Sequence, residues 1–329
     1  SQRVRYNSEL QSLDSTVHDY YGMGKGQIES LNGRKLHNLG FMGQGMTIAV
    51  LDAGFMNVDK IAAFRNLNIK GTHNFVAGYD NDVYKEMDHG TKTLSTIAMN
   101  QPTVFVGTAP KADFWLLRTE DYSTESPAEE DFWIAAVEFS DSVGVNIISS
   151  SLGYHGFDDK TMNYRYSDLN GRTAAISQAA SRLASKGMIL VNSAGNDGMG
   201  TWKKINVPAD AHDILTVGAV TLDKVNAPFS SIGPTADGCI KPDVMAYGCP
   251  TNVVSGRGYI IPDNGTSFAC PLIAGMVACL WQACPNKSAK EILDIVRQSG
   301  NNCQSPDNIM GYGIPDFWSA YQSVTRYNQ

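Results

Sequence analysis

The feature that most constrains the fold of this chain is a repeated alternation of short apolar segments with longer helical ones. The first apolar segment, residues 46–51, is rich in β-branched side chains, which is typical of a parallel strand buried on both faces. Helices are then predicted at 89–99, 127–142, 173–186, 267–282 and 288–299, and strands at 112–117, 145–149, 188–192 and 214–220. This rhythm predicts an α/β fold: a three-layer, doubly wound, mostly parallel sheet with helices on both faces.

The overall composition argues against two classes of partner. The 329 residues carry a formal net charge of −7 and show no basic stripe, so nucleic acid is not expected as a partner. No apolar run reaches the roughly 18 residues that a membrane-spanning helix needs, so no membrane span is expected. Residues 1–30 lack a charged-then-apolar signal pattern, so a targeting segment is expected to be absent or removed.

The six cysteines leave the redox compartment open. They form no C-x-x-C pair, which argues against a zinc or thioredoxin-type site, and no metal site is predicted. Two disulfides are the first candidates: Cys239–Cys249 and Cys284–Cys303. Cys270 and Cys279 lie in an apolar helical stretch and are expected to be small buried hydrophobic residues.

Three short segments place a reactive side chain where a parallel sheet would expose it. Asp52 directly follows the first strand, His89 begins a predicted helix, and Ser267 stands immediately before the apolar helix 268–282. Functional groups in such sheets gather beyond the carboxyl ends of the strands, so these three side chains are candidates for one site.

The chemistry these three residue types can perform is that of an activated hydroxyl. A serine alcohol is a poor nucleophile unless a base removes its proton during attack. Histidine is suited to act as that base, because its ordinary pKa is about 6.5 and it can return the proton to a leaving group. A buried carboxylate would hold the imidazole in one tautomer. Alone, each residue has a plainer explanation: a turn or cap aspartate, a helix-start histidine, or an N-cap serine.

A fourth candidate, Asn196, follows the predicted strand 188–192 in the segment Asn-Ser-Ala-Gly-Asn. Its amide could donate a hydrogen bond to a tetrahedral oxyanion. Without further context an asparagine in Gly-Asn-Asp-Gly would be interpreted as a turn residue.

Taken together, five short blocks resemble the signature blocks of the subtilase family of serine proteases. They are VLDAG at 50–54, HGT at 89–91, SSSLG at 149–153, SAGN at 193–196 and GTSFA at 265–269. They occur in the family's order, with aspartate first, then histidine, then serine. The resemblance covers roughly residues 40–320. It implies a subtilisin-like fold, with residues 41–329 as the catalytic domain and 1–40 as an N-terminal extension packed on it.

The resemblance also implies roles for individual residues. Asp52 would orient His89, which would act as general base and acid for attack by Ser267. The oxyanion donor would be Asn196, together with the backbone N–H of Ser267. An extended polypeptide substrate would lie along an edge strand, by strand addition, and the primary specificity pocket would face it. The implied substrate-binding residues are Ser151, Leu152 and Gly153 on the strand and Ser193, Ala194 and Gly195 on the pocket wall.

The chain departs from the family pattern in a few places. Lys92, Thr93 and Ser95 replace residues common in the family, and they are expected to face the helix body and leave the catalytic residues intact. The segment 99–107, where many relatives bind calcium, is short and has no carboxylate. The sequence therefore does not support a structural calcium site. The resemblance implies that catalysis needs no cofactor.

Three functions remain open on these residues. The resemblance implies a serine endopeptidase that cuts polypeptides through an acyl-enzyme, is exported, and is made with an inhibitory propeptide. Residues 1–40 are too short for such a propeptide, so a mature or trimmed form is expected. The alternatives are a catalytically silent subtilase fold that binds ligands, and an esterase or transpeptidase on the same site.

Overall fold

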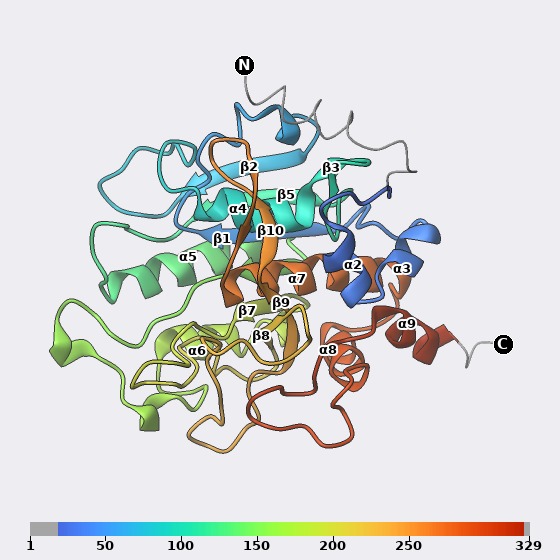
Figure 1. Ribbon diagram of the computed structural model, residues 1–329. Coiled ribbons are helices and arrows are strands. Elements are labelled where there is room, and N and C mark those ends of the chain that lie inside the picture. The colour runs from blue at the N-terminus through green and yellow to red at the C-terminus, as the bar shows by residue number, and fades with distance from the viewer. Residues whose placement is uncertain (1–18, 326–329) are drawn as a thin grey trace.

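The computed structural model describes residues 19–325, and its centre is a seven-stranded sheet (Figure 1). The strands lie in the order β2-β5-β1-β6-β7-β8-β9, and all neighbouring pairs are parallel. They span β1 (Thr47–Asp52), β2 (Asn68–Asn74), β5 (Asp113–Arg118), β6 (Ile147–Ser150), β7 (Ile189–Ser193), β8 (Leu215–Thr221) and β9 (Val244–Cys249).

Helices cover both faces of this sheet, as the sequence predicts (Figure 1). They are α2 (Lys25–Ser30), α3 (Arg34–Asn38), α4 (His89–Ala98), α5 (Ala128–Ser142), α6 (Ala175–Ala180), α7 (Thr266–Ala283), α8 (Ala289–Gln298) and α9 (Phe317–Thr325). Four short 3₁₀ turns lie between them: Ala62–Phe64, Lys160–Met162, Tyr166–Asp168 and Ala184–Lys186. Two small hairpins complete the fold: β3 (Asn100–Gln101) with β4 (Phe105–Val106), and β10 (Thr251–Val254) with β11 (Ile260–Asp263).

The two faces of β1 show how the layers are held. Ile48 and Val50 belong to the apolar cluster that contains α4, α7 and α8, whereas Ala49 and Leu51 belong to the cluster that contains α5 and α6. Successive side chains of a strand point to opposite faces, so a strand covered on both sides must be apolar throughout. This confirms the predicted three-layer, doubly wound α/β fold.

The most buried helix is α7, which packs on β6, β7, β8 and β9. Within residues 19–325 it is the one helix with the length and hydropathy of a membrane span, and 83% of that window is buried inside the protein. α7 is therefore a core helix of the protein. Because it is buried on all sides, it carries apolar residues all round its surface.

Some element boundaries differ from the sequence predictions. The helix predicted at 173–186 ends at Ala180. Both edge strands, β2 and β9, were missed. β2 is only partly buried and carries polar residues, so it lacks the apolar run that marks an interior strand.

Neither candidate disulfide is present, because all six cysteines are free. The thiol of Cys239 faces the ring of His212, and that of Cys303 lies beside the Gln304 side chain. Cys284 is buried at the end of α7, so the pairing Cys284–Cys303 would have to join a buried thiol to a loop thiol turned elsewhere. The prediction that Cys270 and Cys279 are buried is confirmed.

Candidate active site

The side chain of Asp52 is fully buried at the carboxyl end of β1 and held by three donors. Its Oδ1 accepts hydrogen bonds from the His89 ring nitrogen Nδ1 at 2.7 Å and from the Ala53 backbone N–H at 2.8 Å. Its Oδ2 accepts one from the Thr93 hydroxyl at 3.0 Å. Since a carboxylate can only accept, Nδ1 of His89 must carry a proton, which leaves Nε2 as the acceptor in the neutral ring.

His89 is the first residue of α4, which begins against the end of β1. The N–H of Gly90 donates to the carbonyl of Gly54 at 2.9 Å, and this bond brings the start of the helix to the segment that follows Asp52. Burial lowers the pKa of His89, but the Asp52 charge and its hydrogen bond outweigh that effect. The pKa therefore lies above its ordinary value of 6.5. Such an imidazole is basic enough to accept a proton from an alcohol.

The residues expected to face only the helix body lie closer to the site than predicted. Thr93 donates directly to Asp52, and Lys92 pairs with Asp263 at 3.0 Å and with Asp88 at 3.5 Å. Lys92 lowers the pKa of His89 and Asp263 raises it, so this pair contributes to the field around the imidazole. Helical periodicity could have indicated that Thr93 lies near the site, because Thr93 is four residues after His89 and such residues share one helix face.

Ser267 is the second residue of α7 and is 8% exposed. Its hydroxyl lies 3.5 Å from the Ser151 carbonyl, while the ring of the next residue, Phe268, lies 5.7 Å from the His89 ring between centroids. The structure therefore brings Ser267 and His89 to the same edge of the sheet, although their side chains are not directly hydrogen-bonded to each other. Catalytic hydrogen bonds are often long in unliganded enzymes and shorten when substrate binds.

Two features of the backbone at Ser267 follow from its place at the start of α7. Pro271 has no N–H, so the Ser267 carbonyl lacks its usual partner in α7, and the Ser151 hydroxyl donates to it instead at 2.8 Å. The N–H of Ser267 is among the first of the helix and, within residues 19–325, donates to no acceptor. A helix N-terminus with an unused N–H stabilises a negative charge that lies close to it.

Asn196 lies beside this helix start, after β7. Its Oδ1 accepts from the backbone N–H of Thr266 at 2.9 Å and from the Thr266 hydroxyl at 3.0 Å. These two bonds fix which end of the amide is oxygen, and the Nδ2 group has no acceptor in the described part of the chain. Gly195, with φ of 107°, makes the turn that brings Asn196 there, and a side chain at this position would crowd Ser231 and Asn206.

The six expected substrate-binding residues lie at or just beyond the ends of the neighbouring strands β6 and β7. β6 ends at Ser150, so Ser151, Leu152 and Gly153 lie beyond the sheet rather than in a strand; the Asn192 side chain bonds the Leu152 carbonyl at 3.0 Å. The expected pocket-wall residues, Ser193, Ala194 and Gly195, lie at the end of β7 and just beyond it, and the first two are buried. Within the described chain no hydrogen bond uses the N–H of Leu152 or of Gly153.

A cavity of about 430 Å³ adjoins this site, lined by Ala53 next to Asp52 and by Leu152. Its remaining wall is largely acidic: Glu120, Asp121, Glu125, Glu129 and Asp158. Burial raises the pKa of Glu129 to about 7 and holds that of Glu120 well above its usual range. Glu129 is also 1% exposed, so part of this acidic wall is buried.

Comparison with known proteins gives consistent matches. The family model for the subtilase family matches residues 43–313. Subtilisin NAT of Bacillus subtilis subsp. natto is 28% identical over 283 residues, which is 85% of this chain and 67% of that protein. The thermostable alkaline protease of Halalkalibacterium halodurans is 27% identical over 87% of this chain and 70% of its own length. Subtilisin DY of Bacillus licheniformis is 26% identical over 84% of this chain and 90% of its own length.

Proposed function

Because this chain belongs to the subtilase family and is a serine endopeptidase, we propose that Ser267 is its nucleophile, His89 its general base and acid, and Asp52 the orienting carboxylate. The observation that carries the assignment is the 2.7 Å hydrogen bond between His89 Nδ1 and Oδ1 of the fully buried Asp52 carboxylate. This bond leaves Nε2 of the neutral His89 ring without a proton. The same ring packs beside Phe268, the residue that follows Ser267.

The proposed reaction has two halves. In the first, Nε2 of His89 takes the hydroxyl proton as the Ser267 oxygen attacks the scissile carbonyl, and the same proton then passes to the leaving amine. In the second, a water molecule replaces the amine and attacks the acyl carbon as His89 removes its proton. The bond between that carbon and the Ser267 oxygen then breaks, and His89 returns the proton to the Ser267 oxygen. Asp52 stays ionised throughout and stabilises the imidazolium formed in each half.

Negative charge that develops on the substrate oxygen would meet two donors, the N–H of Ser267 and Nδ2 of Asn196. Both groups have no acceptor within residues 19–325, and both lie at the start of α7. Donors that are already oriented need no reorganisation as the charge forms, which is why such sites are effective.

We propose that an extended polypeptide binds along residues 151–153, opposite 193–195. The unused N–H groups of Leu152 and Gly153 support this, because strand addition needs main-chain donors without partners. We also propose an extracytoplasmic location and synthesis with an inhibitory propeptide, since these are properties of the family.

Covalent labelling tests the nucleophile directly. A fluorophosphonate is expected to modify Ser267 in the folded protein, because its phosphorus accepts attack by an activated serine oxygen. The labelling rate should rise with pH through a midpoint above 6.5, since His89 accepts the proton only when neutral and its pKa is raised. Peptide mapping by mass spectrometry locates the label and a pH series gives the midpoint.

A label on another serine, or none on Ser267 before unfolding, would contradict the proposed nucleophile and would favour a silent subtilase fold that binds ligands. Labelling of Ser267 combined with cleavage of esters but not of peptides would favour an esterase on the same site.

Replacing Asn196 with leucine is expected to lower kcat for peptide hydrolysis by about 10²- to 10³-fold, with KM nearly unchanged. Leucine keeps the branched shape but lacks the Nδ2 donor, whose contribution is made only when the oxyanion forms. This magnitude was measured on a subtilisin. Steady-state kinetics on a peptide amide check it, with Asn286→Leu on the loop between α7 and α8 as the control. A loss expressed mainly in KM would contradict an oxyanion role.

A further inference from the structure

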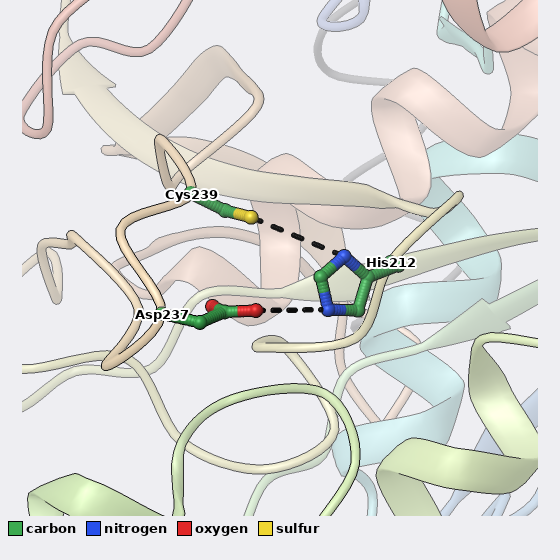
Figure 2. A group of neighbouring side chains, drawn as sticks. All are labelled: His212, Asp237 and Cys239. Carbon is green, nitrogen blue, oxygen red and sulfur yellow. Dashed lines mark hydrogen bonds and ion pairs between the residues drawn. The ribbon is translucent and has the colours of Figure 1, made fainter.

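A second group of reactive side chains lies far from the candidate active site: His212, Asp237 and Cys239 (Figure 2). The Cys239 Sγ atom lies 3.9 Å from Nδ1 of His212, and an Asp237 carboxylate oxygen lies 3.2 Å from Nε2 of the same ring. The imidazole thus stands between a thiol and a carboxylate, with a different ring nitrogen facing each.

The proton on the His212 ring is assigned by a further neighbour. Nε2 also lies 3.1 Å from the backbone carbonyl of Asn170. A carbonyl oxygen and a carboxylate can only accept, so Nε2 carries the proton and Nδ1 is the bare acceptor in the neutral ring. The atom facing the Cys239 thiol is therefore the one that can take its proton.

A tight turn fixes the thiol and the carboxylate relative to each other. The hydroxyl of Thr235 donates to Asp237 at 2.6 Å and accepts the Cys239 backbone N–H at 2.8 Å, and the Thr235 N–H donates to the Cys239 carbonyl at 3.0 Å. Gly171 packs directly against the His212 ring, so closely that any side chain at this position would overlap the ring.

This group lies at the amino ends of the sheet strands, whereas Ser267 lies at their carboxyl ends. His212 and Cys239 precede β8 and β9 and so lie at the amino ends of parallel strands, whereas Asp52 lies at a carboxyl end. A cavity of about 310 Å³ opens beside the thiol, lined by Cys239, His212 and the ion-paired Lys241, Asp243 and Arg297. The side chain of His212 is 31% exposed, so small molecules can reach the group.

We propose that Cys239 is a reactive thiol, a modification site for small disulfides, with His212 as its proton acceptor and Asp237 holding the ring. The arrangement suits a thiol better than a metal ion, because the two ring nitrogens face different partners and Nε2 is already occupied by acceptors. Reactive cysteines typically lie partly exposed beside a histidine, as Cys239 does.

The modification is a balanced thiol–disulfide exchange. The Cys239 proton passes to Nδ1 of His212, and the thiolate sulfur attacks one sulfur of the incoming disulfide. The new Sγ–S bond forms as the old S–S bond breaks, and the departing thiolate takes the proton back from His212. One thiol and one disulfide are consumed, and one mixed disulfide and one thiol are produced, so no other oxidant is needed.

The test uses the full chain carrying Ser267→Ala, which prevents self-digestion and makes the result independent of the proposed peptidase mechanism. Limiting dithiobis(nitrobenzoate), an aromatic disulfide whose released thiolate is coloured, should modify Cys239 before Cys249 and Cys303, the other partly exposed cysteines. Mass spectrometry of the peptides identifies the modified residue. Equal or slower modification of Cys239 would overturn the proposal.

In a background that also carries Cys249→Ser and Cys303→Ser, His212→Gln should slow the reaction at neutral pH about tenfold, because the base is lost. His155→Gln is the matched control, since His155 is also 31% exposed and lies 4.0 Å from an aspartate, but has no thiol partner. Its rate should equal that of the parent.

The rates of the parent and of His212→Gln should converge well above pH 8.5, about where an ordinary thiol ionises without a base. A purely structural effect of the substitution would persist there. The neighbouring Arg297–Asp243 ion pair stays formed over that range, because the pKa of Arg297 lies above its ordinary value and the pKa of Asp243 lies below its own. If His212→Gln unfolds the protein, Asp237→Asn provides the second variant and should slow the reaction a few-fold. An unchanged rate in the folded variant would overturn the proposal.

Discussion

Replacing Ser267 with alanine is expected to lower kcat for peptide hydrolysis about 10⁶-fold, the magnitude measured when a subtilisin loses its serine. The alcohol oxygen is the atom that becomes acylated, so neither His89 nor the oxyanion donors can substitute for it. Residual hydrolysis above the uncatalysed rate should remain, because substrate positioning and the oxyanion donors survive.

The fold should tolerate this change, since within residues 19–325 the one hydrogen bond of the Ser267 hydroxyl is a 3.5 Å contact with the Ser151 carbonyl. Hydrolysis of casein and of a peptide amide measures the loss, and thermal unfolding checks the fold. Ser142→Ala, on the exposed end of α5, is the matched control and should keep full activity. Activity of the Ser267→Ala variant within tenfold of the parent would show that the nucleophile lies elsewhere.

Replacing Asp52 with asparagine is expected to lower kcat about 10⁴-fold with little change in KM. The reason is that all three partners of the carboxylate donate: the His89 Nδ1–H, the Ala53 N–H and the Thr93 hydroxyl. An asparagine amide presents an NH₂ group to one side. If that side faces His89, the ring takes the other tautomer, with its proton on Nε2, and cannot accept the serine proton.

Thr93→Val provides the control for this result. Valine keeps the shape and removes one donor to Oδ2, but the carboxylate charge and the bond to His89 remain, so kcat should fall less than about tenfold. Steady-state kinetics of both variants at one pH make the comparison. A loss for Asp52→Asn as small as that for Thr93→Val would contradict the orienting role of Asp52.

Much of the architecture follows from local patterns along the chain. Strands β1, β6, β7 and β8 are buried on both faces, so they must be short apolar runs, and such runs are visible in the sequence. The same holds for α7, where burial on all sides requires an apolar residue at almost every position. Edge strand β2 and helix α9 were not predicted, because they bury only part of their surface and their patterns are correspondingly weak.

The candidate site divides in a similar way. Its four principal residues, Asp52, His89, Asn196 and Ser267, stand in short blocks that indicate them from the sequence. The spacing along α4 places Thr93 on the same helix face as His89, but its hydrogen bond to Asp52 does not follow from that spacing, and neither does the acidic lining of the neighbouring cavity. Both depend on how side chains approach one another across elements, which no single stretch of sequence encodes.

The fold class, the order of the buried elements and the residues able to do the proposed chemistry can all be derived from the amino-acid sequence, because burial and reactive residue types leave local patterns in it. Folding brings together the groups that interact: three donors on the Asp52 carboxylate, and a thiol, an imidazole and a carboxylate at the amino ends of β8 and β9. It also leaves the Ser267 N–H, at the start of α7, without an acceptor among residues 19–325. Such contacts join residues distant in the chain, so they exist only once the chain has folded.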